Sequence, residues 1–384
     1  MKKKLLFING HLNTGGVEKS LLDILTHLDY DKYEVDLLLV EQLGDYATQI
    51  PEQVNIIFKS IEKTYGPFLT VIKTAIKNKD WFSLKMRLIF LIMKVFGQKQ
   101  VSLASTLLTG KKHYDCVIGF RSGFCTQIAA LAVNADKKIT WWHHGEINID
   151  VDSYAEVAIK CDTVVAVSDY CKQMLIDKIP VLKDKIVVIN NIVDDEVIKK
   201  KAAEFNPCYD EEKIHIVSVG RLALEKHYDN AVYAAKVLKE KDINFKWHLV
   251  GDGILREELE HMAIDMEIED CFIFEGNQVN PYPYIKHADL FVHPSYVESF
   301  GIVVAEALAL GIPCVVTKSE GVLELLEDGE NAILTEKNRE SLVEKIVELL
   351  ENKELYKIIE GNSVCNEQVI PNNIIKKLEK LIEE

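Results

Sequence analysis

Two glutamates eight positions apart, Glu298 and Glu306, are the side chains of this sequence best placed to bind a polar ligand. If a helix begins near Phe300, Glu298 lies in the loop before it and Glu306 about two turns along it, so the carboxylates can contact different parts of one elongated ligand. The amides of Phe300 and Gly301 would lie between them, at a helix N-terminus that favours a phosphate. Because Glu306 has apolar neighbours, we expect its carboxylate to be buried and to need a partner.

Basic residues upstream complement these carboxylates. A predicted strand at 214–219 ends in Gly220 and Arg221, and Lys226 follows at the start of the next helical pattern. A guanidinium fork and a compact ammonium suit a diphosphate, and in a chain with a net charge of −15 local cations must attract it. The alternative is a surface Arg and Lys in weak salt bridges, which would be preferred if this pair stood alone.

A glycine loop follows the first predicted strand, Leu5 to Asn9, and places Gly15 and Gly16 directly before a helical pattern. Free amides and the helix dipole favour an anion there, and the glycines let a ligand approach the backbone. An ordinary strand-to-helix turn would also explain two glycines. The loop matches neither G-x-G-x-x-G nor a P-loop, which argues against a nicotinamide-dependent dehydrogenase and a P-loop NTPase.

Two adjacent histidines, His143 and His144, follow a predicted strand at 139–142 and precede Gly145. Open parallel sheets hold their ligands at the carboxyl ends of the strands, so this position favours polar contacts to a ligand. The two tryptophans before the histidines could equally make the group a packing cluster.

All of these residues follow apolar runs that predict strands, and the runs alternate with stretches of helical periodicity throughout the chain. The expected strands are Leu5 to Asn9, Val35 to Val40, Val117 to Gly119, Ile139 to Trp142, Thr163 to Val167, Val187 to Asn190, Ile214 to Val219, Phe245 to Val250, Phe272 to Glu275, Leu290 to His293 and Pro313 to Thr317. With 384 residues the pattern predicts an α/β protein of two doubly wound, Rossmann-like domains. We place them at 1–195 and 205–365, with a terminal helix in 366–384.

The composition excludes several classes of protein. A net charge of −15 argues against nucleic-acid binding, which needs clustered Lys and Arg. The eight cysteines form no C-x-x-C pair or zinc-ligand spacing, as expected for reduced thiols of the cytoplasm. The longest apolar run, Leu88 to Met93, falls far short of the roughly 20 residues that span a bilayer, and the N-terminal apolar run is too short for a signal peptide.

Residues 59–112 differ from the rest because they carry eleven Lys and Arg against two acidic residues, a net charge of +9. The stretch from Trp81 to Phe96 is also strongly apolar, a composition typical of interfacial helices. One interpretation is that this segment binds an anionic membrane surface as its partner. The other is that it is a crossover helix with its apolar side in the core and its lysines in water.

Together these motifs resemble the retaining, nucleotide-sugar-dependent glycosyltransferases of family 4, which have the GT-B architecture. The similarity covers both halves, and its most specific part is the E-x7-E motif from Glu298 to Glu306 within a longer matching pattern. Further matches are Gly15-Gly16-Val17-Glu18, Val219-Gly220-Arg221-Leu222 with Lys226, Val250-Gly251-Asp252-Gly253, Val167-Ser168, Asn191 to Asp194, and Gly321 with Glu324.

The resemblance implies a role for each matching residue. Arg221 and Lys226 would hold the donor diphosphate with help from the Gly15-Gly16 loop, Glu298 would contact the donor sugar, and Glu306 would contact the ribose hydroxyls. The other implied donor-binding residues are Gly251, Ser299, Phe300 and Gly301. The active-site histidine would be His143 or His144, and we prefer His144 because it directly precedes Gly145. Lys226 is followed by His227 where the family commonly has Gly, which questions the geometry of that loop.

The resemblance also implies two domains facing a cleft, retention of anomeric configuration, and no metal or cofactor beyond the nucleotide-sugar substrate. We expect transfer from a UDP-sugar to a lipid-linked or polysaccharide acceptor of a cell-surface glycan, by a cytoplasmic protein held peripherally at the inner face of the plasma membrane. The alternatives are a soluble-acceptor transferase, a nucleotide-sugar epimerase of the same fold, and a catalytically silent sugar-binding subunit.

Overall fold

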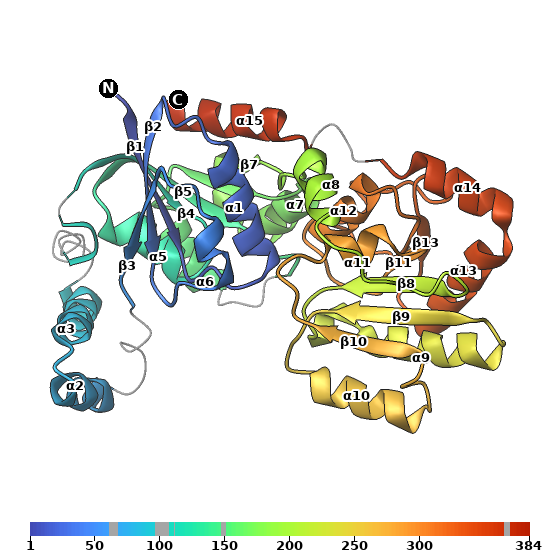
Figure 1. Cartoon of the computed structure of the whole chain (residues 1–384). Coiled ribbons are helices and arrows are strands. Elements are labelled where there is room, and N and C mark those ends of the chain that lie inside the picture. Colours follow the sequence, from blue (N-terminus) through green and yellow to red (C-terminus); the bar gives the residue numbers. More distant parts are fainter. Residues whose placement is uncertain (61–67, 97–106, 111, 147–150, 365–368) are drawn as a thin grey trace. The chain divides into compact units, whose positions relative to one another are not determined.

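The computed structural model describes residues 1–60, 68–96, 107–110, 112–146, 151–364 and 369–384. The chain divides into two compact units (Figure 1). Unit 1 comprises Met1–Ile189 and Ile375–Glu384, and unit 2 comprises Asn190–Ile374.

Unit 1 is built on a parallel sheet of seven strands in the order β3-β2-β1-β4-β5-β6-β7. The strands are β1 (Lys3–Asn9), β2 (Tyr33–Leu39), β3 (Val54–Phe58), β4 (Tyr114–Gly119), β5 (Ala135–Trp142), β6 (Thr163–Ala166) and β7 (Ile186–Val188). The helices are α1 (Gly16–His27), α2 (Phe68–Lys77), α3 (Trp81–Phe96), α5 (Phe124–Ala132), α6 (Val151–Ala158) and α7 (Asp169–Lys178), with short 3-10 turns at Asp45–Gln49 and Pro180–Lys185. The strand order reverses direction between β1 and β4, the point at which doubly wound sheets bind ligands.

Unit 2 repeats this arrangement with six parallel strands in the order β10-β9-β8-β11-β12-β13. The strands are β8 (Ile214–Val219), β9 (Phe245–Val250), β10 (Phe272–Gly276), β11 (Leu290–His293), β12 (Cys314–Thr317) and β13 (Ile333–Thr335). The helices are α8 (Asp195–Ala202), α9 (Tyr228–Glu240), α10 (Arg256–Asp265), α11 (Tyr282–Lys286), α12 (Ile302–Ala309), α13 (Arg339–Glu351) and α14 (Lys353–Asn362), with a 3-10 turn at Leu224–Lys226. The expected α/β class with two doubly wound domains is confirmed.

Two strands, β3 and β13, were not expected. β3 is an edge strand with mostly half-buried or exposed side chains, and β13 has only three residues. Both therefore lack the continuous apolar run that marks a central strand of a parallel sheet.

The division into compact units falls at Ile189, six residues before the expected first boundary at residue 195. The helix α8 packs on α11 and α12, so residues from Asn190 onward belong to unit 2, and the segment expected between the domains is largely this helix. Unit 2 also extends to Ile374, beyond the expected end at residue 365.

The terminal helix α15 (Pro371–Glu383) is placed by the structure, since its larger part belongs to unit 1 (Figure 1). The Lys32 ammonium donates to Glu379 at 3.0 Å, and the Tyr33 hydroxyl donates to Glu383 at 3.3 Å. The Lys137 ammonium donates to the carbonyl of Leu381. The chain therefore begins in unit 1, forms unit 2 and returns.

The basic segment contains two helices, α2 and α3, and part of it lies outside the described residues. In α3, Met86 and Ile89 are buried in a cluster with Leu38 and Tyr114 of the sheet. This face of α3 agrees with the interpretation as a crossover helix. Large apolar side chains are nevertheless exposed, namely Leu69 (69%), Ile76 (55%), Trp81 (60%) and Leu88 (41%). No helix in the described part of the chain is long and apolar enough to cross a membrane.

Candidate active site

The carboxyl edge of the unit 2 sheet brings together a cation, a carboxylate and an imidazole. The Lys226 ammonium donates to Glu298 Oε1 at 2.5 Å, and His293 Nε2 lies 2.6 Å from the same oxygen. The three side chains are largely buried, with exposed fractions of 19% for Lys226, 10% for Glu298 and 1% for His293. The two expected residues Lys226 and Glu298 therefore meet, and the sequence analysis did not single out His293.

The Glu298 carboxyl stays ionised in this setting. Burial by itself would raise the pKa of Glu298, but the adjacent Lys226 ammonium and the hydrogen bond to His293 outweigh it and hold that pKa far below its usual range. A buried carboxylate with a cation and a hydrogen-bond donor on one oxygen is fixed in both charge and orientation.

The turn that carries Lys226 depends on an unusual backbone conformation. His227, which stands where the resembling family commonly has Gly, adopts a left-handed conformation with φ +49°. That conformation costs a non-glycine residue about 1 kcal/mol. The His227 ring stacks on Tyr296 with centroids 3.7 Å apart, and the Tyr296 amide donates to the Glu225 carbonyl at 3.2 Å. The loop after β11 thus holds the Lys226 turn in place although the glycine is absent.

The second motif carboxylate, Glu306, lies on α12 and accepts a hydrogen bond from the Tyr282 hydroxyl at 2.7 Å, so its expected burial with a partner is observed. Glu306 and Glu298 thus have different partners within the protein.

The helix α12 begins at Ile302, two residues later than the sequence pattern predicted. Gly301 precedes it at φ +80°, where an added Cβ would lie 2.5 Å from Val322 Cγ1, and Phe300 is buried as a core side chain. The loop at Ser299 is also tight, because a Cβ on Gly321 would lie 2.5 Å from the Ser299 carbonyl carbon. Gly301, the N-cap residue, has no side chain to cap α12, and the Val304 amide donates to the Gly301 carbonyl at 3.0 Å, so the first-turn amides of Ile302 and Val303 are the candidates for an anion.

Arg221 and Gly251 are placed differently. The Arg221 side chain is 71% exposed and pairs with Glu225 at 2.8 Å, so the structure does not bring it into contact with Lys226 and Glu298. Gly251 has φ +142°, and a Cβ there would lie 1.9 Å from the Gly220 carbonyl oxygen. Only glycine therefore lets the ends of β8 and β9 approach so closely.

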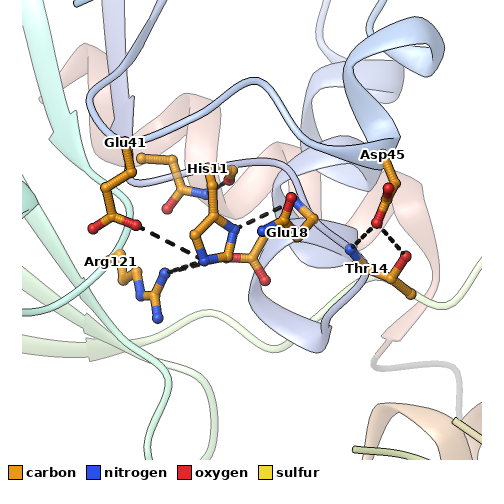
Figure 2. Close-up of polar contacts among 8 residues, drawn as sticks. His11, Thr14, Glu18, Glu41, Asp45 and Arg121 are labelled. Carbon is orange, nitrogen blue, oxygen red and sulfur yellow. Dashed lines mark hydrogen bonds and ion pairs between the residues drawn. The ribbon is translucent and has the colours of Figure 1, made fainter. Parts of the chain in front are cut away.

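In unit 1 a second polar group gathers at the strand ends (Figure 2). His11 follows β1, Glu41 follows β2 and Arg121 follows β4, three neighbouring strands. The Arg121 guanidinium donates to His11 Nε2 at 2.9 Å, whereas Glu18 lies 3.6 Å from His11 Nδ1 and 3.7 Å from Arg121. Glu41 is 4.0 Å from His11. These charges are close without forming hydrogen-bonded ion pairs.

The glycine loop lies directly beside this group. A Cβ on Gly15 would lie 2.6 Å from Glu18 Oε2, and the Thr14 amide and hydroxyl both donate to Asp45, at 3.0 and 2.9 Å. Gly16 is the first residue of α1, which no side chain caps within the described residues. The expected anion site at this helix end therefore has the buried Glu18 carboxylate in its first turn, the position at which the helix dipole stabilises a negative side chain.

The two adjacent histidines have opposite environments. His143 is buried against the Phe120 ring at 4.8 Å and stacks on Trp141, and burial, with a smaller contribution from His144, lowers the pKa of His143 to about 3. His144 is half-buried, and its Nε2 lies 2.8 Å from Ser122 Oγ. The packing interpretation thus applies to His143, whereas His144 is half-buried between the Trp142 ring edge and Ser122.

The sequence analysis did not single out five residues that the fold brings into contact with these groups. They are His293, Tyr282, His11, Arg121 and Ser122. His293 alone carried a local signal, since it ends a strand directly before Pro294-Ser295. Among the described residues no group of three His, Cys, Asp or Glu side chains is arranged to hold a metal ion.

Comparison with known proteins finds matches over both units. The family profile "Glycosyltransferase Family 4" matches residues 14–197, and "Glycosyl transferases group 1" matches residues 199–363.

Two relatives match over nearly their whole length. An uncharacterised glycosyltransferase of Haemophilus influenzae is 26% identical over 93% of this chain and 92% of its own. The N-acetylgalactosamine-N,N'-diacetylbacillosaminyl-diphospho-undecaprenol 4-alpha-N-acetylgalactosaminyltransferase of Campylobacter jejuni is 25% identical over the same shares. Among solved structures, Anabaena HepE in complex with UDP and glucose superimposes with a TM-score of 0.72, 19% identity and full coverage of both chains.

Proposed function

Since this chain belongs to glycosyltransferase family 4 and has the GT-B fold, we propose that it transfers a sugar from a UDP-sugar to a lipid-linked or polysaccharide acceptor in the synthesis of a cell-surface glycan. The Lys226–Glu298–His293 group carries the proposal, because it places a cation and an oriented carboxylate at the carboxyl edge of the unit 2 sheet. The UDP in HepE supports the choice of donor nucleotide, and the name of the Campylobacter relative supports a lipid-linked acceptor.

In the proposed mechanism the bond between the sugar and the diphosphate breaks, and negative charge develops on the departing phosphate. Lys226 and the first-turn amides of α12 stabilise that charge. The Arg221 guanidinium leaves Glu225 and binds the phosphate. Glu298 binds the donor sugar through its hydroxyls, and Glu306 binds the ribose. These groups neutralise the phosphate charge in the proposal, so it involves no metal ion.

The acceptor hydroxyl attacks the anomeric carbon from the face of the leaving group, and its proton passes to the phosphate oxygen that leaves. The sugar therefore keeps its anomeric configuration without a protein nucleophile. In the proposal His144 is the active-site histidine, with Ser122 fixing its ring.

The exposed apolar side chains of α2 and α3 support membrane association of unit 1. Lys73, Lys77 and Lys85 are exposed on the same two helices and Lys79 is exposed in the turn between them, so an anionic lipid surface at the cytoplasmic face would bind both kinds of side chain. Lys112 does not contribute, because it pairs with Glu34 and Asp36 at 2.8 Å.

A donor panel tests the function. A UDP-sugar at 100 times its dissociation constant should stabilise the fold by about 2.7 kcal/mol, and the same sugar should be transferred to a lipid-linked acceptor with retention. Glu298→Gln should lower transfer by about 10³-fold. The matched control is Glu336→Gln, which alters an exposed glutamate paired with Lys318 and should leave transfer unchanged. Full activity of Glu298→Gln, or conversion of donor to another nucleotide sugar without acceptor, would contradict the proposal.

Vesicle binding tests the membrane part. Exchanging Lys73, Lys77 and Lys85 for Glu should weaken binding to phosphatidylglycerol vesicles at least about 100-fold, because each lysine contributes about 1 kcal/mol. The same exchange of Lys199, Lys241 and Lys353, exposed lysines of unit 2, should have little effect. If the two variants bind the vesicles equally well, the anionic lipid surface is not a partner of this protein.

A further inference from the structure

We propose that His293 is a positioning residue that holds Glu298 by one oxygen, so that the other carboxylate oxygen faces the donor sugar. This inference rests on the proposed function, because it assigns the free oxygen to the sugar that the transferase binds.

Two donors share one oxygen of Glu298. The Lys226 ammonium and His293 Nε2 approach Oε1 at 2.5 and 2.6 Å, and no hydrogen bond found among the described residues engages Oε2. A carboxylate held through one oxygen by two donors from different directions cannot rotate freely about its terminal bond. Oε2 is therefore held ready for a sugar hydroxyl.

Hydrogen-bond counting fixes the protonation of His293. Because an ionised carboxylate only accepts, Nε2 must carry a proton. Nδ1 is buried and has no hydrogen-bond partner among the described residues, so a proton there would leave a buried N–H unpaired, which costs about 1–3 kcal/mol. The neutral ring with its proton on Nε2 satisfies Nε2 and avoids an unpaired N–H at Nδ1.

A neutral donor suits this position because Lys226 already balances the charge of Glu298. A second cation on Oε1 would bind the carboxylate more strongly than a neutral donor does and would compete with the sugar hydroxyl for the charge of the carboxylate. The neutral imidazole instead orients the carboxylate without changing the net charge of the group. His293 does not contact the substrate in this arrangement and acts through Glu298.

The backbone around His293 makes it a rigid donor. It is the last residue of β11, pairs with Val316 of β12 in the sheet and has its ring nearly parallel to Phe291, at an interplanar angle of 12°. Two residues further on, the Ser295 hydroxyl donates to the Glu225 carbonyl at 3.2 Å, which ties the following loop to the Lys226 turn. The hydrogen bond from Ser295 to Glu225 therefore joins the loop that follows His293 to the turn that carries Lys226, the other donor to Glu298.

A matched pair of amide substitutions tests the proposal. The amide nitrogen of Gln reaches the position of Nε2, whereas that of Asn reaches only the position of Nδ1. His293→Gln should keep kcat within about threefold of the native value, and His293→Asn should lower kcat about 10- to 100-fold with the KM for the donor within about threefold. Equal kcat values for the two variants, or a rise in KM that accounts for the whole loss, would overturn the proposal.

A carboxyl titration followed by ¹³C NMR gives a readout that does not depend on activity. His293→Asn removes a donor to the ionised form, so the pKa of Glu298 should rise above its value in the native protein, while His293→Gln should leave that pKa low. Identical titrations in the native protein and both variants would overturn the inference. A native protein that transfers no sugar from any UDP-sugar refutes the proposed function instead, and the titration still decides the role of His293.

Discussion

The carboxyl edges of the two sheets bear polar groups that differ in how tightly they are joined. In unit 2, Lys226, Glu298 and His293 are hydrogen-bonded through one oxygen at 2.5 and 2.6 Å. In unit 1, Glu18 and Glu41 lie 3.6 to 4.0 Å from His11 and Arg121. The same architecture thus supports a preformed group in one unit and a loosely joined one in the other.

The difference follows from the loops that carry these side chains. The Lys226 turn and the Glu298 loop are tied to one another by His227, Tyr296 and Ser295, so their side chains have little freedom. In unit 1 the loop between β1 and α1 is bonded to the segment after β2 through the backbone of Gly10 and Leu12 and through Thr14 with Asp45, contacts that involve none of the charged side chains of the His11 group. A preformed group needs no reorganisation when a ligand arrives, whereas the group in unit 1 retains room to adjust.

The largest expected effect comes from removing the cation in the preformed group. Lys226→Met leaves a buried carboxylate unpaired, so we expect the free energy of unfolding to fall by about 3–5 kcal/mol, and Lys226→Met with Glu298→Gln to recover part of it. Arg121→Met, the counterpart in unit 1, should cost about 1 kcal/mol because Arg121 is 36% exposed and 3.7 Å from Glu18. Urea unfolding, with hydrogen exchange in β11 and β1 to separate the units, measures both. Equal losses would remove the distinction between the two groups.

An intermediate effect should come from the buried histidine of unit 1. The pKa of His143 is lowered to about 3 from an ordinary value near 6.5, so the unfolded chain binds the proton first as the pH falls. The native protein should therefore lose about 2 kcal/mol of stability from this residue between pH 6.5 and pH 5. His143→Phe should abolish that part of the pH dependence, and His144→Asn should retain it. If the stability of His143→Phe keeps the same pH dependence, a group other than His143 causes it.

The smallest expected effect concerns the exposed loop contact of unit 1. Thr14→Val removes the hydroxyl donor to Asp45 and keeps the side-chain shape, so the free energy of unfolding should change by less than about 1 kcal/mol. Asn230→Leu, which removes the hydrogen bond to Tyr296 in unit 2, should cost about 1–3 kcal/mol because Asn230 is buried. Thermal unfolding compares the two. A greater loss from Thr14→Val would show that the unit 1 loop is as firmly held as the Lys226 turn.

Much of the fold could be predicted from the sequence because central strands of parallel sheets are continuous apolar runs. Lys226 and Glu298 were assigned to one site only through the family resemblance, because they are 72 positions apart and no local spacing joins them. The place of Arg221 did not follow, since its pairing with Glu225 depends on how a short turn exposes the guanidinium. His11 and Arg121 are 110 positions apart and meet because β1 and β4 are neighbours, which no local pattern records. The helical pattern of α15 likewise could not show which unit it covers.

The return of α15 to unit 1 has a consequence for how the chain is made. During synthesis Lys32 and Tyr33 emerge early, but their partners Glu379 and Glu383 are added only after all of unit 2. Unit 1 therefore has all of its strands before unit 2 is made, but the surface that α15 covers stays open until the end of synthesis. The order of completion in the cell is thus the reverse of the order in which the two units begin.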